Sequence, residues 1–118
     1  MAGVKVSISG NMVRAPGAVR EMRREQRAKI QEICERKVAE EQATHAYTNR
    51  TGAAQESTAV TGKIDGDRFE LKIGMGVKYA VFLDAAGLTN IREKAAEARV
   101  EIREYLRETA ARVRRGDY

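Results

Sequence analysis

The sequence predicts an α+β fold, in which a small antiparallel sheet of three or four strands packs with two long amphipathic helices in the order β-α-β-β-β-α. Alternating apolar and polar residues, at the start of the chain and after an Asp-Gly turn, predict the strands. Two long segments with helical apolar spacing, one on either side of this turn, predict the helices. The 118 residues suffice for a single α+β domain over 1–118, with 1–15 as an N-terminal strand or arm and 47–84 as a β-rich centre.

The first predicted element is a strand over residues 3–9. Val4, Val6 and Ile8 alternate with polar residues, which is the period of a half-buried strand. Gly10-Asn11 is expected to end it. The strand could pair at the edge of the central sheet or remain a loose terminal arm, and we favour pairing.

The second predicted element is a long amphipathic helix from Ala18 to about His45, a segment without Pro or Gly. Its apolar residues fall mostly three, four or seven positions apart. They are Val19, Met22, Ile30, Ile33, Cys34 and Val38. At a rise of 1.5 Å per residue the helix would be roughly 40 Å long, which exceeds the diameter of a small domain. We therefore expect one end to project or to pack on a neighbouring subunit.

The densest basic run of the chain lies early in this helix. It consists of Arg20, Arg23, Arg24, Arg27 and Lys29. Such a run can bind nucleic acid, but a solvated helix face is the more common explanation.

The centre of the chain is predicted to contain strands and tight turns. An irregular strand is expected over 54–64, followed by a hairpin turn at Asp65-Gly66-Asp67. After the turn, Phe69, Leu71 and Ile73 alternate with charged residues and are predicted to face the core. A turn or bulge is expected at 74–76, and a further strand or short helix at 77–83.

The last predicted element is a second amphipathic helix that ends near Arg115. Asn90 or Thr89 is expected to cap it, with Glu93 completing a capping box after Asn90. Gly116 is expected to terminate it. Its apolar stripe is half alanine, which allows close packing on the sheet or on the first helix. The stripe is Ile91, Ala95, Ala98, Ile102, Leu106, Ala110 and Val113.

The sequence offers no pattern for catalysis, a metal or a cofactor. Cys34 and His45 are the only residues of their types, so neither an internal disulfide nor a His/Cys metal site is expected. Cys34 is interpreted as a small apolar helix residue. The carboxylates of Asp65 and Asp67 belong to a predicted turn, and nothing places Glu56 or Asp84 beside them. We therefore expect a protein that is not an enzyme.

Composition sets broad limits on partners. The net charge is +5, from 22 basic and 17 acidic residues, which permits contact with nucleic acid without demanding it. No apolar run approaches the ~20 residues that cross a bilayer, and the N-terminus lacks the apolar segment of a signal peptide. Neither a membrane partner nor export is expected.

The central stretch carries a set of motifs in a fixed order. Arg50-Thr51-Gly52 is followed by Gln55-Glu56-Ser57, the hairpin at 65–67, and then Tyr79-Ala80 with Asp84 after it. With the flanking helices, this pattern resembles the small tail-component or head–tail joining proteins of long-tailed bacteriophages. The family commonly has proline before the threonine-glycine, where this chain has Tyr47-Thr48-Asn49. It also often has a proline-rich loop at the place of 85–90. Tail completion, tail terminator and head-side connector all stay open as subfamilies.

The resemblance implies a non-enzymatic virion protein of the neck or tail end, assembled in the cytoplasm of the bacterial host. Its expected partners are copies of itself in a ring, hexameric by resemblance, together with neighbouring connector and tail-tube proteins, and phage DNA in passing. Ring subunits need head-to-tail complementary surfaces rather than catalytic residues. The candidate subunit-contact residues are Arg50, Thr51, Gly52, Gln55, Tyr79 and Asp84.

The alternative function is a small basic nucleic-acid-binding module that uses the basic run of the first helix. Acidic residues that interrupt the basic runs, and the scarcity of aromatic residues for base stacking, count against it.

Overall fold

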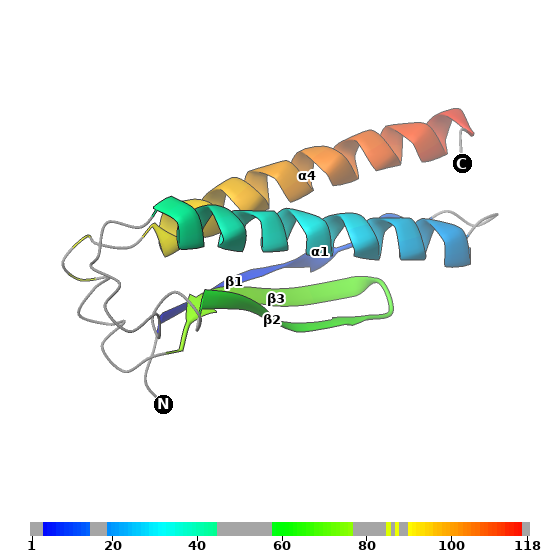
Figure 1. Cartoon of the computed structure of the whole chain (residues 1–118). Coiled ribbons are helices and arrows are strands. Elements are labelled where there is room, and N and C mark those ends of the chain that lie inside the picture. The colour runs from blue at the N-terminus through cyan, green and yellow to red at the C-terminus, as the bar shows by residue number, and fades with distance from the viewer. Residues whose placement is uncertain are drawn as a thin grey trace.

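The protein has an α+β fold, as the sequence predicts. The computed structural model describes residues 4–14, 19–44, 58–76, 85, 87 and 90–116. The elements along the chain are β1 (Val4–Asn11), α1 (Val19–Thr44), β2 (Thr58–Asp65), β3 (Arg68–Met75) and α4 (Ile91–Arg115). Both helices lie on one side of the sheet (Figure 1). The strand or short helix expected over 77–83 falls outside the described residues.

The sheet has the order β1-β3-β2, and both pairings are antiparallel. β3 is central because its alternating apolar residues, Phe69, Leu71 and Ile73, are the most regular in the chain, and all three are buried. β1 pairs with β3 along its whole length, from Val4 opposite Met75 to Asn11 opposite Arg68. The N-terminal segment is therefore an edge strand, as favoured above, and not a loose arm.

A two-residue turn joins β2 to β3, as predicted. Gly66 has a φ of 59° and Asp67 follows it, so the residue with positive φ stands first, as in the type II′ turns that suit hairpins. The carboxylate of Asp67 accepts hydrogen bonds from Arg14 at 2.5 Å and from Arg23 at 3.0 Å. These bonds hold the turn against the start of α1.

Two glycine segments that were predicted to end strands lie inside them instead. Gly10 and Asn11 still pair with Phe69 and Arg68, because the absence of a side chain at Gly10 leaves room for the Phe69 ring. The turn or bulge expected at 74–76 is likewise wrong for its first two residues. Gly74 lies close to the backbone of the opposite strand, and Met75 is fully buried. In both places glycine permits close contact between neighbours rather than a change of direction.

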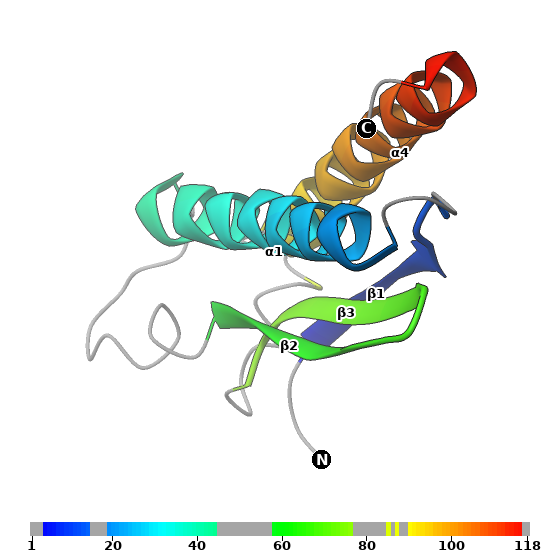
Figure 2. The same cartoon turned by 90° about the vertical axis from the view of Figure 1, so that its right-hand side faces the viewer.

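The two helices form one layer over the sheet. α1 has 26 residues and lies beside β2, while α4 has 25 residues and packs on α1, β1 and β3. Figure 2 shows that α4 rises away from the sheet toward its C-terminal end. The molecule measures 52 × 23 × 19 Å, so α1, at roughly 39 Å from its 1.5 Å rise per residue, is longer than either short dimension.

The start of α4 differs from the predicted capping box. The side chain of Asn90 makes no capping hydrogen bond. Instead, both carboxylate oxygens of the fully buried Glu41 accept the Asn90 backbone N–H, at 3.0 and 3.2 Å. A carboxylate here is favourable because a helix N-terminus carries partial positive charge. At the other end Gly116 has a φ of 78° and terminates the helix, as predicted.

The core consists of aliphatic residues and methionine with Phe69 and Cys34. In the apolar stripe of α4, Thr109 is buried in place of the predicted Ala110, which is only partly buried. Cys34 is fully buried in α1, where burial, with the nearby Glu35 carboxylate, raises the pKa of its thiol to about 11. No helix in the described part of the chain is long and apolar enough to cross a membrane.

Candidate functional site

The six candidate subunit-contact residues lie outside the described residues. They are Arg50, Thr51, Gly52, Gln55, Tyr79 and Asp84. Candidate surfaces are therefore sought on the two helices and the sheet.

The five residues of the predicted basic face do not form one face. Arg20, Arg23, Arg24 and Arg27 fall on one side of α1, because three and four positions bring a helix back to the same side. Lys29 lies on the flank of α1 that faces α4, where its ammonium is 3.5 Å from Glu32. The prediction is therefore wrong for Lys29, and a count at 100° per residue along the helix would have shown it.

The four arginines also differ in what they contact. Arg23 is half-buried and its guanidinium is bound to Asp67. Arg24 and Arg27 are exposed and line a groove of about 430 Å³ between α1 and β2. Its floor contains Ala28, Ile64 and Leu71, and Gly62 and Lys63 border it on β2. We call this surface the basic groove.

The cations of the basic groove have no acidic partner within the described residues. No carboxylate there forms an ion pair with Arg24, Arg27 or Lys63. An arginine that has no internal partner is available for a carboxylate or phosphate of another molecule.

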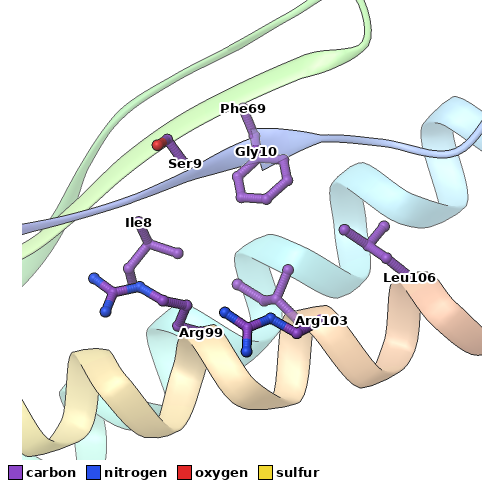
Figure 3. A pocket seen from close by; sticks show the side chains of 8 residues that line it. Ile8, Ser9, Gly10, Phe69, Arg99, Arg103 and Leu106 are labelled. Carbon is purple, nitrogen blue, oxygen red and sulfur yellow. The ribbon is translucent and has the colours of Figure 1, made fainter.

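A second hollow, of about 240 Å³, separates β1 from α4 (Figure 3). It exists because α4 rises from the sheet toward its C-terminal end. Apolar side chains line it, and Figure 3 shows Arg99 and Arg103 projecting from α4 at the same hollow. Arg99 donates a hydrogen bond to the Ser7 carbonyl at 2.9 Å. This bond occupies part of the outer edge of β1. The apolar lining residues are Ile8, Phe69, Ile102 and Leu106.

On the opposite flank of α1, the seam with α4 is a network of ion pairs. The ammonium of Lys37 lies 3.0 Å from Glu97, 3.3 Å from Glu101 and 3.6 Å from Glu40. Lys94 lies 3.0 Å from Glu40 and extends the network along α4. Only 8% of the Lys37 side chain is exposed, so its carboxylate partners offset the loss of its hydration.

The network keeps its members charged. Burial alone would lower the pKa of Lys37, but the hydrogen bonds to Glu97 and Glu101 outweigh it and raise that pKa. The hydrogen bond from Lys37 lowers the pKa of Glu97, and the one from Lys94 lowers the pKa of Glu40. The ion pairs that join the two helices therefore persist at neutral pH.

Gln26 is another buried polar side chain with a structural role. Its amide accepts the Val13 N–H at 2.7 Å and donates to the Val13 carbonyl at 2.8 Å. The side chain thus pairs with the backbone after β1 much as a neighbouring strand would. It fixes the end of β1 against α1.

The acidic, His and Cys side chains of the described residues do not gather into a metal site. No group of three or more His, Cys, Asp or Glu side chains among them could hold a metal ion. The hydrogen bonds from Arg14 and Arg23 lower the pKa of Asp67, which keeps this turn carboxylate ionised and occupied. The described surface carries two hollows that another molecule could enter, the basic groove and the hollow between β1 and α4.

Three residues of these surfaces were missed at the level of sequence. Arg99 and Arg103 are four positions apart and flank the predicted apolar stripe of α4, so a helical projection would have placed them beside it. Lys63 had no such signal, because only the docking of α1 beside β2 brings it near the arginines.

No protein-family model matches the chain, and neither a curated protein nor a solved structure matches it significantly.

Proposed function

We propose that the chain is a non-enzymatic structural protein of the bacteriophage neck or tail end. In this proposal its copies form a ring, hexameric by resemblance, that joins or completes the connection between head and tail. The ring would belong to the virion and would assemble in the host cytoplasm. Its neighbours would be connector and tail-tube proteins.

The observation that carries the proposal is the placement of the two contact surfaces at opposite edges of the sheet. The basic groove borders β2, and the hollow between α4 and the sheet borders β1. A ring subunit needs surfaces that differ from one side of the fold to the other, because head-to-tail contacts join unlike surfaces. The hairpin of β2 and β3 between two long helices is also compatible with the phage resemblance.

The test is electron microscopy of phage particles assembled without this protein. We expect unjoined heads and tails, and joining should return when the wild-type chain is supplied. Particles that join and mature normally without the protein would contradict the proposal.

A nucleic-acid-binding module is the second candidate, favoured by Arg24 and Arg27, which have no acidic partner among the described residues. Binding to phosphates would weaken steeply as salt rises, because each neutralised phosphate releases counterions. The measurement is the affinity for duplex and single-stranded DNA across a salt series, with Arg24→Gln/Arg27→Gln as the variant. Absent or salt-independent binding would remove this candidate.

A further inference from the structure

α4 carries an apolar side chain that the fold leaves uncovered. Val100 is 50% exposed and is the exposed large hydrophobic residue of the described chain. It stands two positions from Ala98 and two from Ile102, both buried. Residues two apart lie on nearly opposite sides of a helix, so Val100 points away from the core.

Two carboxylates follow Val100 toward the C-terminus of α4, turned progressively toward α1, where they line a shallow hollow with Lys29 and Arg36. Glu104 and Glu108 follow Val100 at intervals of four residues, and both are exposed. Neither forms an ion pair with a cation of the described residues. We call Val100, Glu104 and Glu108 the acidic ridge.

The acidic ridge and the basic groove are complementary in chemistry. The groove has two exposed guanidinium groups, from Arg24 and Arg27, above a floor that includes Ile64 and Leu71. The ridge has two carboxylates that can bind the guanidinium groups and one aliphatic side chain that can cover the floor.

We propose that the basic groove of one copy of this chain receives the acidic ridge of a second copy. This inference rests on the proposed function to the extent that both require the chain to assemble with itself. In the complex, Glu104 and Glu108 bind Arg24 and Arg27, and Val100 covers the apolar floor.

The contact is head to tail. The groove lies between α1 and β2, whereas Glu104 and Glu108 of the ridge border the other flank of α1, where α4 and α1 meet. Each bound pair therefore leaves one free groove and one free ridge. Repeated contacts of this kind form a ring if the rotation between copies closes, and a filament if it does not.

A second copy fits the groove better than a nucleic-acid backbone does. A phosphodiester chain would satisfy the two arginines but would leave the apolar floor without an apolar partner. The ridge supplies both kinds of group at neighbouring positions of one helix. Its carboxylates also lack internal partners within the described chain, as the groove's guanidinium groups do.

The experiment is sedimentation velocity of the full chain over a wide concentration series. Arg24→Glu/Arg27→Glu reverses the groove, and Glu104→Arg/Glu108→Arg reverses the ridge. Each variant is expected to self-associate at least about tenfold more weakly than wild type, because like charges then face each other. The chain with all four substitutions, in which the charges are again complementary, is expected to recover self-association.

Controls separate the contact from folding and from net charge. Arg68→Glu/Lys72→Glu makes the same change in charge on exposed residues of β3 and should leave self-association unchanged. Val100→Ser should weaken self-association without a change in the circular dichroism spectrum. If one double variant fails to fold, the other can be mixed with wild type to test the contact. The folded variant then has one reversed surface, and its unreversed surface should still bind the wild-type chain.

Two results would overturn the inference. One is a wild-type chain that stays monomeric over the whole series. The other is folded groove and ridge variants that associate like wild type, or a folded fourfold variant that does not recover. Groove and ridge variants that associate like wild type would place the self-contact elsewhere and leave the ring proposal standing. Normal joining of particles that lack the protein would instead contradict the ring proposal itself.

Discussion

The two flanks of α1 carry similar residues in opposite situations. On the flank facing α4, Lys37 and Arg36 both lie within ion-pair distance of glutamates on α4. On the flank facing β2, Arg24 and Arg27 border a groove with no carboxylate partner in the described chain. One helix thus has a flank whose charges are satisfied within the fold and a flank whose charges are not.

The difference shows why charge counts alone say little about function. Ion pairs at a half-exposed seam each contribute about 1 kcal/mol or less, yet together they fix the relative position of the helices. Unpaired arginines contribute little to folding and are available to another molecule. The two flanks should therefore respond differently to mutation, stability depending on one and association on the other.

The largest effect on stability is expected from the apolar layer beneath the seam. Ile33 is 1% exposed, so Ile33→Ala would leave a cavity and lower the free energy of unfolding by about 2–4 kcal/mol. Ile64→Ala, at the partly buried floor of the groove, should cost less than half as much. Urea denaturation of both variants measures the difference. Equal losses would mean that the groove side is as tightly packed as the seam.

Gly62 is the next most sensitive position, and it sharpens the comparison because it borders the groove. Its φ is 113°, and a Cβ there would collide with the backbone of Glu70 and Leu71. Gly62→Ala should lower the free energy of unfolding by about 1–3 kcal/mol through backbone strain. Gly66→Ala is the matched control, since Gly66 also has positive φ but open space around it. A similar thermal midpoint for the two variants would argue against the collision.

Removing a single charge from each flank of α1 should have a different effect on the free energy of unfolding. Lys37→Met removes the cation that joins three glutamates and should cost about 1 kcal/mol of unfolding free energy. Arg27→Met keeps a similar length and should change it by no more than about 0.5 kcal/mol. Guanidinium chloride is a salt and would screen the ion pairs, so urea is the denaturant for this test. A loss at Arg27 as large as that at Lys37 would show that the groove arginine is needed for folding.

The smallest expected effect is the pH dependence of the seam. Because the pKa values of Glu40 and Glu97 are below their usual 4.5, these groups stabilise the fold fully above pH 4.5. That contribution is lost as the pH falls through the lowered values. The raised pKa values of Lys37 and Lys94 place the corresponding loss above 10.5. The stability difference between wild type and Lys37→Met/Lys94→Met should therefore shrink when urea titrations are moved from neutral to acidic pH, and a constant difference would contradict the assignment.

The fold was predictable wherever its signal is local. Alternation in β1 and β3, the Asp-Gly turn and the spacing in both helices depend on residues close in sequence, and each of these elements is confirmed. The errors occur where the local structure depends on a residue that is distant in the sequence. Gly10 and Gly74 look like strand ends until Phe69 and the backbone of β1 are placed beside them.

The candidate surfaces were predictable only in part. Arg24 and Arg27 stand out in the sequence, but their groove depends on the position of β2, which no local pattern gives. The capping of α4 by Glu41 was missed for the same reason, since 49 positions separate Glu41 from Asn90. Lys29 is different, because the helical period alone excludes it from the face to which it was assigned.

The carboxylate of Glu41 has a mechanical consequence. It anchors the first residues of α4, while near the far end Thr109 is buried and Arg112 lies 2.8 Å from Glu25. A helix of 25 residues with buried side chains near both ends keeps its direction, since a rotation of about 5° at the anchor would move its other end by about 3 Å, given 1.5 Å of rise per residue, and would uncover Thr109. The exposed side of α4 is therefore held in one fixed position relative to the sheet.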